Sequence, residues 1–77
     1  MSKETIKYPN LEDALKRNRI LKKEVAEALG ISVIGLSFKL HGRTELKYKE
    51  AQAIKKLLDE RSGATYNYEY LFKEREV

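Results

Sequence analysis

The chain has 77 residues, of which 42% are hydrophobic and 36% are charged, and it contains no cysteine. This length suits one small domain, and the hydrophobic content argues against a disordered chain. Without cysteine there are neither disulfides nor thiolate metal ligands, and the sequence contains no apolar run of membrane-spanning length and no apolar stretch typical of a signal peptide. We therefore expect a cytoplasmic protein.

The net charge of +4 is unevenly distributed along the chain. Residues 16–49 contain nine basic and three acidic residues, a net charge of +6, which leaves seven basic and nine acidic residues, or −2, for the rest. A basic centre between slightly acidic ends favours a polyanionic partner. The alternative is that these lysines and arginines only solvate helix faces.

The first predicted helix begins around Asn10, which can cap it, while Asp13 three residues later can reach back to the start. Leu11, Ala14 and Leu15 supply the apolar face at the spacing of a helix. The run KRNR then places cations at the negative end of the helix dipole.

A second helix is predicted for residues 22–29, and Gly30 supplies its left-handed end. Lys22 and Lys23 stand at its start, where the helix dipole disfavours cations, and Leu21 has no side chain that could cap it. Unbonded backbone N–H groups beside lysines form an anion site, so this start predicts a contact with phosphate.

The third predicted helix starts after Ser32, a good N-cap, and ends at Gly42. Its two faces are both largely apolar. One carries Val33, Leu36, Ser37 and Leu40, and the other carries Ile34, Phe38 and His41.

The fourth predicted helix spans roughly residues 48–61 and is followed by the break at Ser62 and Gly63. Lys47 and Lys49 flank its start, which again lacks a capping side chain. The apolar stripe of this helix consists of Ala51, Ile54, Leu57 and Leu58.

The last element, residues 66–72, is aromatic and its pattern fits either a strand or a short helix. No partner strand exists elsewhere, and a lone strand cannot satisfy its backbone, so we predict a helical turn. Asn67 would cap it, and Leu71 would be buried with either Tyr70 or Phe72.

The segment LKKEVAEALGISVIGLSFKLHGRTE resembles the helix-turn-helix of the Cro and lambda-repressor superfamily, also called XRE-type regulators. The resemblance depends on residues at the spacing of that motif: Ala26, Gly30, Ile31, Ser32, Leu36 and Leu40. Flanking segments, including KYPNLEDALKRNRI and YEYLF, resemble the first and last helices of small phage repressors. The similarity therefore extends over about residues 7–73.

The resemblance implies an all-α, five-helix, lambda-repressor-like DNA-binding domain whose third helix, residues 32–41, enters the major groove. The domain would span residues 9–73, after an N-terminal arm of residues 1–8 and before a tail of residues 74–77. The base-reading residues would be Ser32, Val33, Ile34, Ser37, Phe38 and His41. The phosphate-contacting residues would be Lys22, Lys23, Lys39, Arg43 and Lys47.

The sequence departs from the family pattern at two places. Leu21 and Lys22 stand where the family often has a capping Thr followed by Gln, and Lys22 keeps the charge for phosphate but lacks an acceptor. Val33, Ile34 and Phe38 stand where polar side chains commonly read base edges.

Three interpretations of these apolar residues are open. The helix reads thymine methyl groups and DNA shape, with hydrogen bonds from neighbouring polar residues. Alternatively, its apolar face binds protein, as in an antitoxin-like partner, an adaptor or a dimer module. In the third interpretation Val33 and Phe38 belong to the core.

The sequence contains no nucleophile–base pair, carboxylate dyad or glycine-rich phosphate loop, so we do not expect an enzyme. We expect no cofactor and no metal, because His41 has no second ligand nearby. The expected function is a phage or bacterial transcriptional regulator, a repressor of the Cro type, that binds a double-stranded operator in the bacterial cytoplasm or the phage-infected host. It would act as a homodimer, for which the candidate surface is Tyr66, Tyr68, Tyr70 and Phe72. We expect neither a membrane nor a small-molecule ligand as partner.

Overall fold

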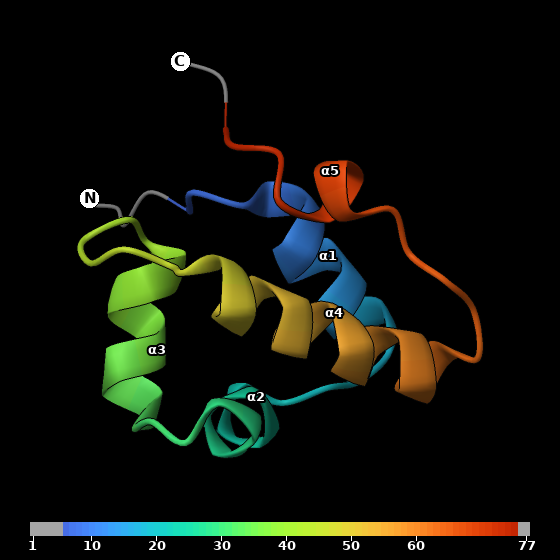
Figure 1. The fold of residues 1–77 in the computed structure, drawn as a ribbon, viewed down its shortest axis with the longest axis horizontal. Coiled ribbons are helices and arrows are strands. Elements are labelled where there is room, and N and C mark those ends of the chain that lie inside the picture. Colours follow the sequence, from blue (N-terminus) through green and yellow to red (C-terminus); the bar gives the residue numbers. More distant parts are fainter. Residues whose placement is uncertain (1–5, 76–77) are drawn as a thin grey trace.

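The computed structural model describes residues 6–75, and these fold into five helices without a strand (Figure 1). The helices are α1 (Pro9–Arg17), α2 (Lys22–Leu29), α3 (Val33–Leu40), α4 (Tyr48–Ser62) and α5 (Tyr68–Leu71). The predicted all-α class is confirmed, and the predicted bounds of the second, third and fourth helices agree closely with the structure.

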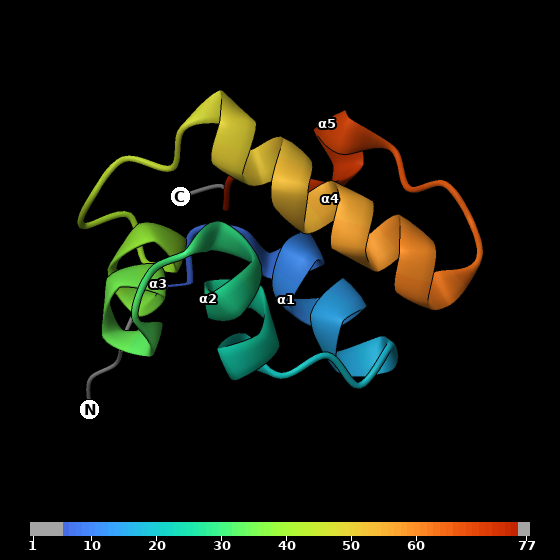
Figure 2. The same ribbon diagram turned by 60° about the horizontal axis from the view of Figure 1, so that its bottom comes forward.

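The core lies where α1, α2, α3 and α4 converge, and leucine side chains dominate it. Helix α2 packs against both α3 and α4, while α5 packs against α1 and α4. In both ribbon views α3 lies at one end of the molecule, and α5 lies away from it beside α4 (Figures 1 and 2). The residues buried without solvent exposure are Leu11, Val25, Leu36, Ile54, Leu58 and Leu71.

The start of α1 differs from the prediction. The helix begins at Pro9, its N-cap is Tyr8, and neither Tyr8 nor Asn10 caps it through a side chain. Proline favours the first helical position because its φ is already helical and the missing N–H would have no partner there. Asn10 instead donates from its Nδ2 to the carbonyl of Tyr70 at 2.9 Å. Asp13 pairs with Arg17 at 2.9 Å rather than reaching back.

The connection between α2 and α3 takes three residues, and its local signals are confirmed. Gly30 adopts φ 72°, and the N–H of Ile31 donates to the carbonyl of Ala26 at 3.0 Å. Ser32 then caps α3, because its Oγ accepts a hydrogen bond from the N–H of Gly35 at 2.9 Å. The short turn fixes the direction of α3 relative to α2.

Helix α5 is capped by Asn67, whose side chain accepts from the N–H of Tyr70 at 2.9 Å, as predicted. Leu71 is fully buried, and Phe72 rather than Tyr70 packs beside the core. The Phe72 ring lies 5.8 Å from the ring of Tyr8 in an edge-on arrangement.

The segment before α1 is hydrogen-bonded to the end of α3, and the segment after α5 is hydrogen-bonded to the segment before α1. The N–H of Lys7 donates to the carbonyl of Leu40 at 3.1 Å, and the N–H of Arg75 donates to the carbonyl of Lys7 at 2.8 Å. Lys7 and Tyr8, assigned to the arm in the sequence analysis, are thus bound to the fold. Residues 1–5 of the predicted arm and 76–77 of the predicted tail lie outside the described residues.

Candidate nucleic-acid interface

Helix α3 has an outward face that is apolar and exposed. Ile34 is 68% exposed, Val33 is 47% exposed and Phe38 is 40% exposed, whereas Leu36 is fully buried. The interpretation of Val33 and Phe38 as core residues is therefore wrong. The helix keeps one apolar face for the core and presents another to solvent.

The polar candidates on α3 lie beside this apolar face. Ser32 is exposed, and its side chain is occupied by the cap, while Ser37 and His41 are half-buried. A side chain at Gly35 would place a Cβ 3.2 Å from Ser32 Oγ, a close contact that a small shift of the capping hydroxyl would have to relieve.

A small hollow of about 100 Å³ brings the start of α2 next to α3. It is lined by Lys22, Val33, Ser37, Leu40 and His41. Four of these five residues were predicted to contact DNA bases or phosphates. The fold thus places a candidate phosphate contact directly beside candidate base-reading side chains.

At the start of α2, some backbone N–H groups have a hydrogen-bond acceptor among the described residues and others have none. The N–H of Leu21 donates to Glu24 Oε2 at 3.4 Å, whereas the N–H groups of Lys22 and Lys23 have no acceptor within residues 6–75. Lys22 Nζ pairs with Glu12 Oε1 at 3.0 Å, and Lys23 is exposed. Both lysines therefore lie at the surface. Lys22 would have to leave the Glu12 carboxylate in order to bind a phosphate.

Glu24 completes this helix start in a way that the sequence analysis missed. Its carboxylate accepts from the Arg61 guanidinium and from the backbone of Leu21, and these two bonds hold its pKa below the ordinary value. The signal for the second bond was present, since a glutamate at the third helical position commonly reaches back. The pairing with Arg61, 37 residues away, leaves no local pattern.

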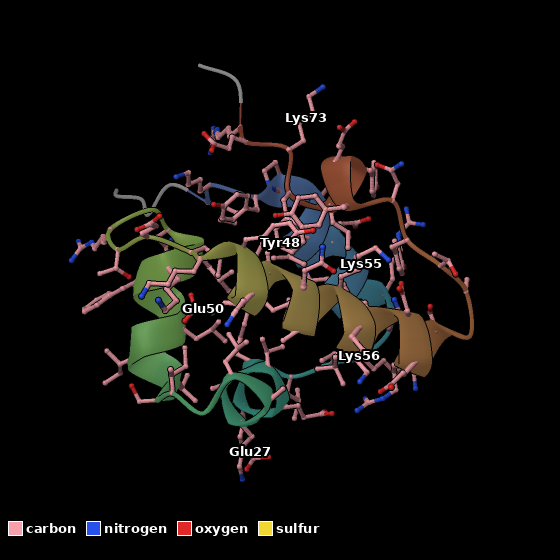
Figure 3. All side chains as sticks on the ribbon, viewed as in Figure 1. Glu27, Tyr48, Glu50, Lys55, Lys56 and Lys73 are labelled. Atoms are coloured by element: carbon pink, nitrogen blue, oxygen red, sulfur yellow. The ribbon has the colours of Figure 1, made fainter. Side chains whose placement is uncertain are left out.

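The start of α4 repeats the arrangement with different partners. Glu50 Oε1 accepts from the N–H of Lys47 at 2.9 Å and pairs with Lys39 Nζ at 3.1 Å (Figure 3). The backbone bond to Lys47 is the largest cause that lowers the pKa of Glu50. Burial is the next largest cause and opposes it, and the hydrogen bond and charge of Lys39 lower the pKa further.

Lys39 is consequently bound inside the protein. Its Nζ also donates to the carbonyl of Glu45 at 3.0 Å, and its side chain is only 15% exposed. Lys39 connects α3 to the loop before α4. Its predicted contact with phosphate stays a prediction, and it would require these bonds to break.

Arg43 and Lys47 lie in the loop between α3 and α4, and both are exposed. The Arg43 guanidinium lies 5.6 Å from the centre of the Phe38 ring, close enough for a cation–π contact. The backbone holds this placement, because the N–H of Arg43 donates to the carbonyl of Phe38 at 2.8 Å. A cation is thus fixed at the edge of the apolar face.

The aromatic residues predicted to form a dimer surface are largely used within the chain. Tyr66 Oη accepts from Asn18 Nδ2 at 3.0 Å. The Tyr68 ring lies 4.9 Å from that of Phe72 and 5.5 Å from that of Tyr48, and burial followed by the nearby Tyr48 raises the pKa of Tyr68. Tyr70 is 48% exposed and is the most accessible of the four.

Within residues 6–75, no group of three or more histidine, aspartate or glutamate side chains is arranged to hold a metal ion. In that same part of the chain, no helix has both the length and the apolar character needed to cross a membrane. Comparison with protein-family models, with curated proteins and with solved structures found no match to this chain.

Proposed function

We propose that the protein is a sequence-specific, double-stranded DNA-binding transcriptional regulator in which α2 and α3 act as a helix-turn-helix. The proposal depends above all on the outward face of α3, where Ile34 and Phe38 are exposed beside the hollow that contains Lys22. An α-helix fits the major groove of B-DNA, and apolar side chains contact the methyl group of thymine there. The three-residue turn and the Ser32 cap give α3 the rigid support that such insertion needs.

The cations around α3 are the second support. Lys22 and Lys23 lie at the start of α2, and Arg43 and Lys47 lie in the loop after α3, so they bracket the helix along the chain. Helix α3 itself contains no acidic residue. Phosphate contacts of this kind position a protein on DNA, while the exposed side chains of α3 would provide the sequence preference.

We further propose that the regulator binds as a homodimer to a two-fold operator. A single eight-residue reading helix contacts few base pairs, and pairing two copies doubles the contacts. Tyr70 offers an exposed aromatic side chain for that contact. Sedimentation of the wild type and of Tyr70→Ala, with and without operator DNA, tests the proposal, which fails if both remain monomeric on DNA.

A protein-interaction module is the second candidate, and the same exposed side chains favour it. Val33, Ile34 and Phe38 form an apolar surface, and apolar surfaces often mark protein contacts. Salt dependence separates the two functions, because binding through phosphates weakens steeply with salt and apolar docking does not.

The direct test is selection of binding sites from a random duplex pool, followed by titration of the selected duplex at several salt concentrations. Four phosphate contacts per protomer give eight for the proposed dimer, which predict a slope of about −7 for log K of the dimer against log salt. Enrichment of a two-fold site with T-rich half-sites supports the proposal. A folded protein that enriches no sequence contradicts it and favours a protein partner.

A charge-reversal pair tests the phosphate role. Lys22→Glu with Lys23→Glu is expected to weaken binding to all duplexes by a similar factor, since phosphates carry no sequence information. The matched control is Lys56→Glu with Lys73→Glu, which changes net charge equally at exposed positions away from α3 (Figure 3). If both double variants lose the same DNA affinity, the effect comes from net charge, and the assigned phosphate contacts of Lys22 and Lys23 are contradicted.

A further inference from the structure

We propose that α3 recognises the C5 methyl group of pyrimidines, so that the protein binds 5-methylcytosine at positions where it binds thymine and rejects unmodified cytosine. The inference rests on the proposed DNA-binding function and names the chemical group that the site would read. Its consequence is that cytosine methylation would create or strengthen binding sites.

The side chains that would face the bases are the basis for this inference. Val33, Ile34 and Phe38 are exposed by 47%, 68% and 40%. None of the three carries a hydrogen-bond donor or acceptor in its side chain. They therefore gain energy from a base only by covering an apolar group in the groove.

The major groove offers these side chains one apolar group. Thymine presents an O4 acceptor and a C5 methyl group, whereas cytosine presents an N4 donor and a hydrogen at C5. Methylation of cytosine at C5 places the methyl group of thymine on the same ring atom. Ile34 or Phe38 would contact the methyl group on either base. An apolar side chain forms no hydrogen bond with the O4 of thymine or the N4 of cytosine, so this contact would not distinguish them.

The charge next to this face favours DNA over an apolar protein partner. The Arg43 guanidinium lies 5.6 Å from the centre of the Phe38 ring, and within residues 6–75 no carboxylate pairs with it. Apolar docking would bury Phe38 and carry this cation toward a dry interface, which costs free energy. In the groove the cation would face phosphates while the ring faces the bases.

The experiment compares one selected duplex in four versions, with thymine, uracil, cytosine or 5-methylcytosine at each T-position of the half-site in turn. Uracil lacks only the methyl group, so it is expected to bind about fourfold more weakly at a contacted position, the factor for burying one methyl group. Cytosine, paired with guanine, is expected to bind weakly, and 5-methylcytosine in the same pair is expected to bind about fourfold more tightly than cytosine, because the methyl group is regained. A hydroxymethyl group places an unpaired hydroxyl against apolar side chains, so 5-hydroxymethylcytosine is expected to bind less tightly than 5-methylcytosine.

A variant pair assigns the effect to α3. Ile34→Ala with Phe38→Ala is expected to bring the thymine-to-uracil ratio close to one. Tyr48→Ala removes an exposed ring on α4 and is expected to leave the ratio unchanged. Circular dichroism confirms that each variant is folded before its ratio is interpreted.

The possible failures are distinct. If the duplex binds with steep salt dependence but uracil equals thymine and 5-methylcytosine equals cytosine, this inference is overturned and the proposed function stands. If the ratio survives in the double alanine variant, the methyl group is read elsewhere, and the assignment to α3 is overturned. If no duplex binds folded protein, both proposals fail together.

Discussion

The inward and outward faces of α3 contain the same kinds of side chain in opposite surroundings. Leu36 and Leu40 point into the core with almost no exposure, while Ile34 and Phe38 stand in solvent on the other side. Burial of the inward pair contributes to folding, and the outward pair contributes little until something covers it. Hydrophobic composition alone therefore does not distinguish a residue that maintains the fold from one available for binding.

The largest expected difference between the faces is in stability. Leu36→Ala leaves a cavity among fully buried neighbours, and it should lower the free energy of unfolding by about 2–5 kcal/mol. Ile34→Ala, on the exposed face, should change it by less than about 0.5 kcal/mol. Urea unfolding followed by circular dichroism measures both variants. Equal losses would mean that the two faces are not distinct in solution.

The second largest effect on stability is expected at Ser32, the N-cap of α3. Ser32→Ala removes the acceptor for the N–H of Gly35 and should lower the free energy of unfolding by about 1 kcal/mol. Ser32→Gly should cost only a few tenths of a kcal/mol, because glycine is itself tolerated at this position. Urea unfolding compares the two. A larger loss for glycine than for alanine would contradict a capping role.

Phe38→Ala sharpens the comparison, because it should affect binding more than folding. The Phe38 ring is exposed and makes a cation–π contact with Arg43, so its removal should lower the free energy of unfolding by only about 0.5 kcal/mol. The DNA sequence preference, measured by repeating the selection, should change. If Phe38→Ala instead unfolds the domain, Phe38 maintains the fold and is not available for binding.

The smallest effect concerns the carboxylates behind the two helix starts. Glu24 and Glu50 have pKa values lowered in the folded protein, Glu24 first by Arg61 and Glu50 first by the N–H of Lys47. Their contribution to stability is therefore present above the unfolded value of 4.5 and is lost as pH falls through the lower folded values.

Thermal unfolding across pH 7 to 3 measures this contribution. Glu50→Gln should lower the midpoint at pH 7 and flatten the decline below pH 4.5 relative to the wild type. Glu69→Gln, at an exposed position on α5, is the matched control and should leave the profile unchanged. A Glu50→Gln profile parallel to the wild type would contradict the assigned role.

The parts of the fold predicted correctly are those specified by nearby residues. The Gly30 turn, the Ser32 cap and the Asn67 cap each involve atoms within a few residues of one another, and the helical period placed Leu36 in the core. At α1 the prediction chose Asn10, a good capping type, over the stronger effect of Pro9 at the first helical position.

The parts that sequence could not provide are contacts between distant segments. Lys22 has the charge expected of a phosphate ligand, yet it pairs with Glu12 from α1. Lys39 looks equally suitable, yet it is bound to Glu50 and to the loop carbonyl of Glu45. Local pattern identifies which residues have a suitable charge, and only the packed structure identifies which of them remain accessible.

The bond between Arg75 and Lys7 has a practical consequence for the order of the chain. Because the N–H of Arg75 donates to the carbonyl of Lys7, a short peptide between these two residues would close the domain into a ring with little entropic cost. New ends could then be opened at the exposed residues 63–65, between α4 and α5. The ends of such a circular permutant would lie between α4 and α5, away from α3 (Figure 1), so labels and fusion partners could be attached without crowding its outward face.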